Sequence, residues 1–183
     1  MISISKPPRE FLPAGIAVIT ISDTRTAADD KSGNTLVERI QDAGHTLVDR
    51  RIVKDDVRQI RAAARVLVKR KDVDVVITTG GTGLTGRDVT IEAMRPLFDK
   101  EIEGFGVIFH MISFQKIKTS TMQSRATAGV VSGKYVFCLP GSPGACRDGW
   151  DEILVHQLDY RHHPCNFIEI MPRLNEHLRR KSS

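Results

Sequence analysis

The sequence has few cysteines: three in 183 residues, at Cys138, Cys146 and Cys165. They lie far apart, in no spacing that is typical of metal ligands, and an odd number argues against a disulfide framework. We therefore expect reduced thiols and no cysteine-bound metal, as in a cytoplasmic protein.

Long apolar runs are absent as well. The stretch 1–15, MISISKPPREFLPAG, has no apolar segment of signal-peptide length. No other segment approaches the roughly 20 apolar residues that a membrane-spanning helix needs. These absences predict a cytoplasmic location and no membrane partner.

Aromatic residues make up only 5% of the chain, whereas the formal net charge is +5, from 27 basic and 22 acidic side chains. A positive charge favours anionic partners, which include both nucleic acids and phosphorylated small molecules. The arginines at 58, 61 and 65 are spread over a predicted helix, with little aromatic interleaving for base stacking. We therefore expect a small anionic ligand and no nucleic acid.

Strand and helix patterns alternate over the first eighty residues. Short β-branched runs predict buried strands, and apolar residues at helical spacing predict helices between them. The predicted order is strand 14–22, helix 33–45, strand 45–53, helix 57–69 and strand 73–79. Such alternation indicates an α/β fold with a parallel sheet flanked by helices. We expect one domain over 14–170, an amino-terminal extension over 1–13 and a carboxyl-terminal tail over 171–183.

The segment 105–114 predicts a helix with two apolar faces. One face, expected to meet the sheet, carries Phe105, Ile108, Phe109 and Ile112. The second face carries Val107, Met111 and Phe114. In a domain of this size, either an internal layer or another subunit has to cover the second face.

Two glycine-rich stretches follow predicted strands: TTGGTG at 78–83 and LPGSPG at 139–144. Ligands of parallel sheets bind beyond the carboxyl ends of the strands, where glycines let backbone amides converge on an anion. The first loop lacks the Lys-Ser or Lys-Thr of a Walker A motif and is not a GxGxxG fingerprint. Both a phosphate-binding loop and a simple tight turn are consistent with its composition.

Several aspartates stand next to predicted strand ends. Arg87 and Asp88 close the first glycine-rich stretch, where a cation can neutralise charge and a carboxylate can bind Mg²⁺. Asp55 and Asp56 follow the second predicted strand, and one of them could instead cap the helix that begins near Val57. Asp23, after the first strand, is open to the same two interpretations.

Taken together, the motifs resemble the MoaB/Mog family of molybdenum cofactor biosynthesis, which is related to the G domain of gephyrin. The resemblance covers Ile16 to about Phe167. It rests on ISD at 21–23, TTGGTG at 78–83, RDVT at 87–90, EGFG at 103–106, SR at 124–125 and LPGSP at 139–143. The stretches SFQKIKTSTMQSRA and QLDYRHHPCNF are more similar to the MoaB branch.

The resemblance implies a three-layer, doubly wound, mostly parallel sheet that binds molybdopterin. It further implies transfer of AMP from MgATP to the terminal phosphate of molybdopterin, with Asp88 and Asp55 as catalytic residues and Mg²⁺ ligands. Mog-like relatives have Pro where this chain has Lys54, so Asp55 and Asp56 both stay candidates for the second carboxylate. The alternative function is a molybdopterin-binding or carrier protein without catalysis.

The same resemblance assigns substrate binding to residues of four loops. These residues are Asp23, Thr79, Gly80, Gly81, Thr82, Gly83, Arg87, Ser124, Arg125, Pro140, Gly141, Ser142 and Pro143. We expect the first glycine loop to hold phosphate and the LPGSP loop to face the pterin. The resemblance also implies a homo-oligomer, trimer or hexamer, and other proteins of the pathway as partners.

Overall fold

The computed structural model describes residues 9–179, in which a six-stranded sheet has the order β2-β1-β3-β6-β5-β4. The neighbouring strands β2, β1, β3 and β6 are parallel, whereas β5 pairs antiparallel with β6 and β4 pairs antiparallel with β5. Residues 1–8 of the expected extension and 180–183 of the expected tail lie outside the described residues. The strands are β1 (Gly15–Ile21), β2 (Thr46–Val53), β3 (Val75–Thr79), β4 (Lys100–Glu101), β5 (Thr127–Val131) and β6 (Lys134–Leu139).

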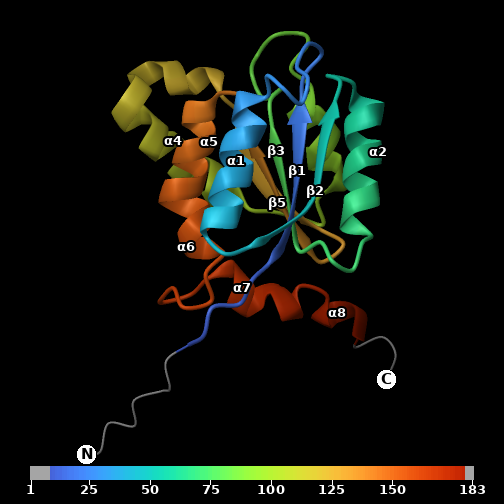
Figure 1. Ribbon diagram of the computed structural model, residues 1–183, viewed down its shortest axis with the longest axis vertical. Coiled ribbons are helices and arrows are strands. Elements are labelled where there is room, and N and C mark those ends of the chain that lie inside the picture. The colour runs from blue at the N-terminus through green and yellow to red at the C-terminus, as the bar shows by residue number, and fades with distance from the viewer. Residues whose placement is uncertain (1–8, 180–183) are drawn as a thin grey trace, which may run out of the picture.

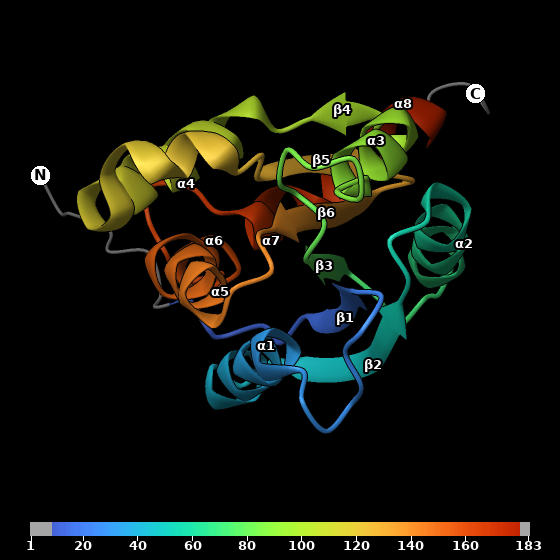
Figure 2. The same ribbon diagram turned by 90° about the horizontal axis from the view of Figure 1, so that it is seen from above.

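Helices cover both faces of the sheet, so the predicted three-layer α/β fold is confirmed (Figure 2). One layer contains α1 (Lys31–Asp42), α4 (Glu103–Ile117), α5 (Pro143–Gly149) and α6 (Val155–Gln157). The other contains α2 (Val57–Val68) and α3 (Thr90–Met94). Two short helices, α7 (Phe167–Ile170) and α8 (Glu176–Arg179), lie at the opposite end of the sheet from the glycine-rich loops (Figure 1).

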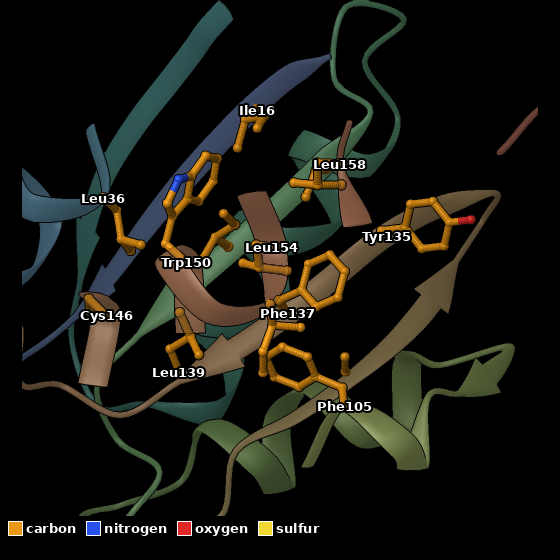
Figure 3. Close-up of a cluster of buried hydrophobic side chains, with 14 of the residues drawn as sticks. Ile16, Leu36, Phe105, Tyr135, Phe137, Leu139, Cys146, Trp150, Leu154 and Leu158 are labelled. Atoms are coloured by element: carbon orange, nitrogen blue, oxygen red, sulfur yellow. The ribbon is translucent and has the colours of Figure 1, made fainter. Parts of the chain in front are cut away.

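The hydrophobic core is split in two by the sheet. Side chains of a strand alternate between its faces, so Ile16 and Val18 of β1 pack on the α1 side, while Ala17 and Ile19 pack on the α2 side. Large side chains gather on the first side, where Trp150 approaches Ile16 and Leu36 (Figure 3). Among residues 9–179, no helix is both long and apolar enough to span a bilayer.

The antiparallel edge of the sheet was not predicted. Strand β5 begins shortly after the SR motif at 124–125, where no strand was predicted, and β4 contains two residues only. Neither has the long alternating pattern that identifies a strand in a sequence. Gly129 allows Phe98 to pack onto β5, because a Cβ at this position would lie 2.3 Å from the Phe98 ring.

Helix α4 keeps only part of its predicted buried face. Phe105 and Phe109 are buried, but Ile108 is 48% exposed, so its predicted place against the sheet is wrong. Only a narrow stripe of α4 contacts β5 and α5, and Ile108 points instead into a cavity of about 460 Å³ beside His156 and Phe167. On the second face Val107 and Met111 are exposed, so within residues 9–179 no internal layer covers them.

One buried carboxylate connects three elements on the α1 side. Asp30 is fully buried and caps α1 by accepting a hydrogen bond from the Gly33 amide at 2.9 Å. It also accepts hydrogen bonds from Thr20 of β1 at 2.6 Å and from Arg50 of β2 at 2.8 Å. Burial by itself would raise the pKa of Asp30, but these hydrogen bonds outweigh it and hold the pKa below its ordinary value.

Replacing this carboxylate should therefore destabilise the fold. We expect Asp30→Ala to lower the free energy of unfolding by about 3 to 5 kcal/mol, because it leaves Arg50 without its buried partner. The matched control is Asp29→Ala, which removes an exposed carboxylate next to it in the chain and should have a much smaller effect. Urea denaturation at neutral pH measures both; equal midpoints for the two variants would contradict the assigned role.

Candidate functional site

Three loops meet beyond the carboxyl ends of β1, β3 and β6. They follow the strands at residues 22–30, 80–89 and 140–142 and lie together at the top of the sheet (Figure 1). Since parallel strands end at the same edge, every residue predicted to bind phosphate or metal from these loops comes to one place. The loop from β2 to α2 brings residues 54–56 to the same edge.

In the loop 80–89, which we call the first glycine-rich loop, the backbone conformation requires glycine. Gly80 and Gly81 have φ angles of +107° and +62°, which side-chain-bearing residues rarely adopt. A Cβ at Gly80 would lie 2.2 Å from the Ile21 carbonyl oxygen, and a Cβ at Gly141 would lie 3.0 Å from the Gly80 Cα. The two glycine-rich loops therefore pack backbone against backbone.

Hydrogen bonds from Thr79 and Thr90 stabilise the packing of the two glycine-rich loops. Thr79 donates from its hydroxyl to the Pro140 carbonyl at 3.0 Å, and the Gly80 amide donates to the Leu139 carbonyl at 3.1 Å. Thr90 donates from its hydroxyl to the Gly80 carbonyl at 2.8 Å. The amides of Gly81 and Thr82 make no hydrogen bond within residues 9–179, so both are available to an anion.

Asp55, from the loop after β2, and Asp88, at the end of the glycine-rich loop 80–89, both lie beside glycines of that loop. A Cβ at Gly81 would lie 2.8 Å from Asp55 Oδ1, and a Cβ at Gly83 would lie 2.7 Å from Asp88 Oδ2. Burial, and secondly the charge of Asp88, raise the pKa of Asp55 above its ordinary value. Asp55 and Asp88 therefore repel each other electrostatically.

The carboxylate of Asp88 is held in its charged form. Burial would raise the pKa of Asp88, but hydrogen bonds from the hydroxyl and amide of Thr85, at 2.6 and 2.9 Å, lower it together with the Gly83 amide. Asp88 is thus a fixed anion at the end of the loop.

The structure distinguishes the two adjacent aspartates that the sequence left as alternatives. Asp56 caps α2, because its carboxylate accepts a hydrogen bond from the Gln59 amide at 2.8 Å. Asp55 makes no such bond and lies beside Gly81 and near Asp88. The helix cap therefore belongs to Asp56, and Asp55 is the carboxylate at the glycine loop.

A divalent cation fits this pair. Within residues 9–179, no group of three or more His, Cys, Asp or Glu side chains could form a complete metal site. Mg²⁺ is commonly bound by one or two carboxylates and completed by water and the phosphates of a nucleotide. Asp55 and Asp88 supply such a partial set next to backbone amides that suit phosphate.

Arg87 and Asp23 form an ion pair that connects the first loop to the loop after β1. The Arg87 side chain is 72% exposed, so its guanidinium lies at the rim of the site. Asp23 does not cap the turn in which it lies. The hydroxyl of Ser22 accepts the hydrogen bonds from the Thr24 and Arg25 amides instead.

Arg125 holds the first loop from outside. Its guanidinium donates to the carbonyl oxygens of Thr82 at 3.2 Å, Gly83 at 2.9 Å and Asp88 at 3.0 Å. It also forms an ion pair with Glu92. These contacts position the loop, whereas direct contact of Arg125 with substrate stays a prediction.

The LPGSP loop borders a cavity of about 420 Å³ between α4 and α5. Pro140 and Ser142 line it, together with Ser124, Phe109 and Arg147. Ser142 also caps α5 by accepting from the Ala145 amide at 3.1 Å, and Pro143 is the first residue of that helix. We call this space the α4–α5 cavity; its volume is in the range of small-molecule sites.

Sequence reasoning missed the residue that fixes the second loop. Arg25 donates to the Gly141 carbonyl at 3.0 Å and lies 3.7 Å from Asp30, so the buried carboxylate is linked to the LPGSP loop. A helix-capping aspartate at Asp30 was recognisable in DKSGN, but its complete burial was not. The buried partners Thr20 and Arg50 come from other strands.

Comparison with known proteins identifies the family. Residues 17–160 match the model of a probable molybdopterin binding domain. Molybdenum cofactor biosynthesis protein B of Escherichia coli strain K12 is 49% identical over 164 residues, which cover 90% of this chain and 96% of that protein. The protein of the same name from Bacillus anthracis is 49% identical over 144 residues, which cover 78% of this chain and 85% of that protein.

Solved structures agree with these relatives. A crystal structure of molybdenum cofactor biosynthesis protein B superposes with a TM-score of 0.81 at 42% identity, covering 93% of this chain and 99% of that one. The tungsten cofactor synthesizing protein MoaB from Pyrococcus furiosus superposes with a TM-score of 0.70 at 34% identity, covering 90% and 96%. The chain therefore belongs to the molybdopterin-binding domain family, among the MoaB and Mog proteins of molybdenum cofactor biosynthesis.

Proposed function

We propose that this protein binds molybdopterin and transfers AMP from MgATP to its terminal phosphate. The observation that supports this most directly is the pair of Asp55 and Asp88 at a glycine-rich loop with free amides. A glycine-rich phosphate loop alone would serve a carrier protein, whereas two neighbouring carboxylates also provide ligands for a divalent cation. The pair is useful when a divalent cation has to be held on a nucleotide.

The reaction needs no protein nucleophile. An oxygen of the molybdopterin phosphate attacks the α-phosphorus of ATP, the bond from that phosphorus to the β-phosphate oxygen breaks, and pyrophosphate leaves with the electron pair. Catalysis of such a step is mainly positioning and neutralisation of charge. Bound Mg²⁺ would supply part of that neutralisation.

Each part of the site has a role in this scheme. Asp55 and Asp88 would hold the cation, and the amides of Gly81 and Thr82 would bind phosphate oxygens. Arg87, at the rim, would steady the charge that develops on the departing pyrophosphate. The α4–α5 cavity beside the LPGSP loop would take the pterin.

The decisive experiment is incubation of the protein with molybdopterin and MgATP. We expect stoichiometric release of pyrophosphate and a product that carries AMP. Binding of molybdopterin without pyrophosphate would favour the carrier function, and absence of molybdopterin binding would contradict both.

Asp88→Asn should preserve the fold and pterin binding but reduce turnover by at least about a hundredfold, because it removes one charged ligand of Mg²⁺. Pyrophosphate release measures the turnover, and pterin fluorescence titration measures the binding. An Asp88→Asn protein with normal turnover would remove this residue from the mechanism.

Variants of the adjacent residues Asp55 and Asp56 should have separate effects, one on turnover and the other on stability. Asp55→Asn should lose turnover without losing thermal stability, since it removes a carboxylate whose charged form the fold disfavours at neutral pH. Asp56→Ala should keep turnover but lose about 1 kcal/mol of stability with the α2 cap. Calorimetry and pyrophosphate release test both variants, and the opposite pattern would transfer the catalytic role to Asp56.

We further propose that a second copy of the chain covers the outer face of α4, as part of a trimer or a hexamer. Val107, Met111 and Phe114 are 59, 64 and 45% exposed, and Ile117 next to them is half exposed. Burial of a large apolar side chain is worth about 1.5 to 3 kcal/mol, so association through this face would be strongly favoured. Each active site would remain largely within one subunit.

Replacing both Met111 and Phe114 by Lys should weaken this interface by several kcal/mol, because it removes apolar burial and introduces unpaired charge. Val66→Lys is the control, since Val66 is equally exposed but lies on α2, on the other face of the sheet. Light scattering should show a multiple of the 20.4 kDa chain for wild type and control, and a smaller mass for the double variant. A monomeric wild type would refute the assembly.

A further inference from the structure

The α4–α5 cavity contains one carboxylate, that of Asp148 on α5. Of the residues within 9–179 that line the cavity, no other is acidic. The Asp148 side chain is only 17% exposed. Its Oδ1 accepts a hydrogen bond from Lys116 Nζ of α4 at 2.5 Å, whereas its Oδ2 has no hydrogen-bond partner among the described residues. Lys116 therefore fixes one oxygen of the carboxylate and leaves the other free to accept hydrogen bonds at the cavity.

The rest of the lining suits a flat ring with polar edges. Phe109 and Ile117 supply apolar surface. Ser113 and Ser124 supply hydroxyl groups that make no hydrogen bond within residues 9–179. Small-molecule sites commonly combine apolar walls with a few polar groups that fix the orientation of the ligand. The cavity therefore provides both a surface for a ring and acceptors and donors for its edge.

The cavity also lies next to the first glycine-rich loop. Ser124, in its wall, precedes Arg125, which holds that loop. The His110 ring of α4 lies 3.0 Å from the Ser124 carbonyl oxygen, so this wall is in contact with α4. Asp148 lies about 9 Å further along α5 than Ser142, at about 1.5 Å of rise per residue. A ligand anchored by its phosphate at the glycine loop would extend its other end towards Asp148.

We propose that Asp148 determines specificity for the pterin ring: its carboxylate accepts hydrogen bonds from the 2-amino group and from N3–H. This rests on the proposed function, because it takes molybdopterin as the ligand of the cavity. The two donors of a 2-amino-4-oxopyrimidine edge lie side by side, as in a guanidinium group, and a carboxylate matches such a fork. A ring with a carbonyl group at position 2 would place an oxygen against the carboxylate and would be rejected.

Binding of isolated rings tests the assignment without any nucleotide. Pterin has the 2-amino group, and lumazine has a carbonyl group in its place. Both are titrated into the protein at slightly acidic pH, where lumazine is uncharged, and are followed by their fluorescence. We expect the wild type to bind pterin at least about tenfold more tightly than lumazine, because lumazine leaves the carboxylate without one donor. Equal affinity for the two rings, or no binding of pterin, would overturn the proposal.

Guanine carries the same edge, so guanosine is the third probe. We expect it to bind less tightly than pterin, because the family domain is one that binds a pterin. Tighter binding of guanosine would overturn pterin as the occupant of the cavity.

Asp148→Asn separates recognition from packing. The side-chain amide has nearly the same shape, but it offers one acceptor oxygen and can donate to the carbonyl group of lumazine. We expect the preference for pterin to fall to within about twofold. Because this preference is a ratio within one protein, a general loss of folded protein leaves it unchanged. A wild-type preference in Asp148→Asn would refute the assignment.

The matched control is Asp151→Asn. Asp151 is 45% exposed, pairs with Arg39 and does not line the cavity. This variant should keep the wild-type preference for pterin over lumazine. Loss of the preference in both variants would show an unspecific effect of removing a negative charge and would contradict the role of Asp148.

Molybdopterin and MgATP are then titrated separately by calorimetry. Asp148→Asn should raise the dissociation constant of molybdopterin about tenfold and leave that of MgATP unchanged, since the glycine loop is intact. If the wild type prefers pterin to lumazine but releases no pyrophosphate, the proposed transfer fails and the assignment of Asp148 stands. If pyrophosphate is released and Asp148→Asn binds molybdopterin as tightly as the wild type does, the assignment is refuted although the function stands.

Discussion

The arrangement of the site depends on the buried carboxylate of Asp30. It joins β1, β2 and the start of α1 through Thr20, Arg50 and the Gly33 amide, and it lies close to Arg25, which holds the LPGSP loop. A buried charge is tolerated only when its partners are in place. The same group that fixes the first helix against two strands therefore also fixes the distance between the loop after β1 and the loop after β6.

The Asp55 carboxylate at the glycine loop has the opposite electrostatic environment. Asp30 is surrounded by donors that favour its charge, whereas the pKa of Asp55 is raised by burial and by the charge of Asp88. The two negative charges repel each other, which disfavours the charged form of Asp55. Proteins commonly give up stability at functional positions in this way. The contrast between the two carboxylate environments separates a structural aspartate from candidate metal ligands.

Helix α4 connects three features of the molecule. Its inner stripe, with Phe105 and Phe109, packs into the core, and its outer face exposes Val107 and Met111. Between these two faces His110 reaches the segment that positions the glycine loop. Because only a narrow stripe of α4 packs into the core, its other side chains are available for other contacts. The exposed face of α4 is thus only a few contacts away from the first glycine-rich loop.

The sequence by itself determined the layered α/β fold, the helix with a second apolar face and the set of loops at the site. These follow from local periodicity, from glycine at strand ends and from the family motifs, all of which depend on residues near one another in the chain. The antiparallel edge, the exposure of Ile108, the assignment of Asp55 and Asp56, and the partners of Asp30, Arg125 and His110 were decided only by the tertiary structure. Each of these depends on which distant backbone or side-chain group lies within hydrogen-bonding or packing distance, and local sequence does not contain that information.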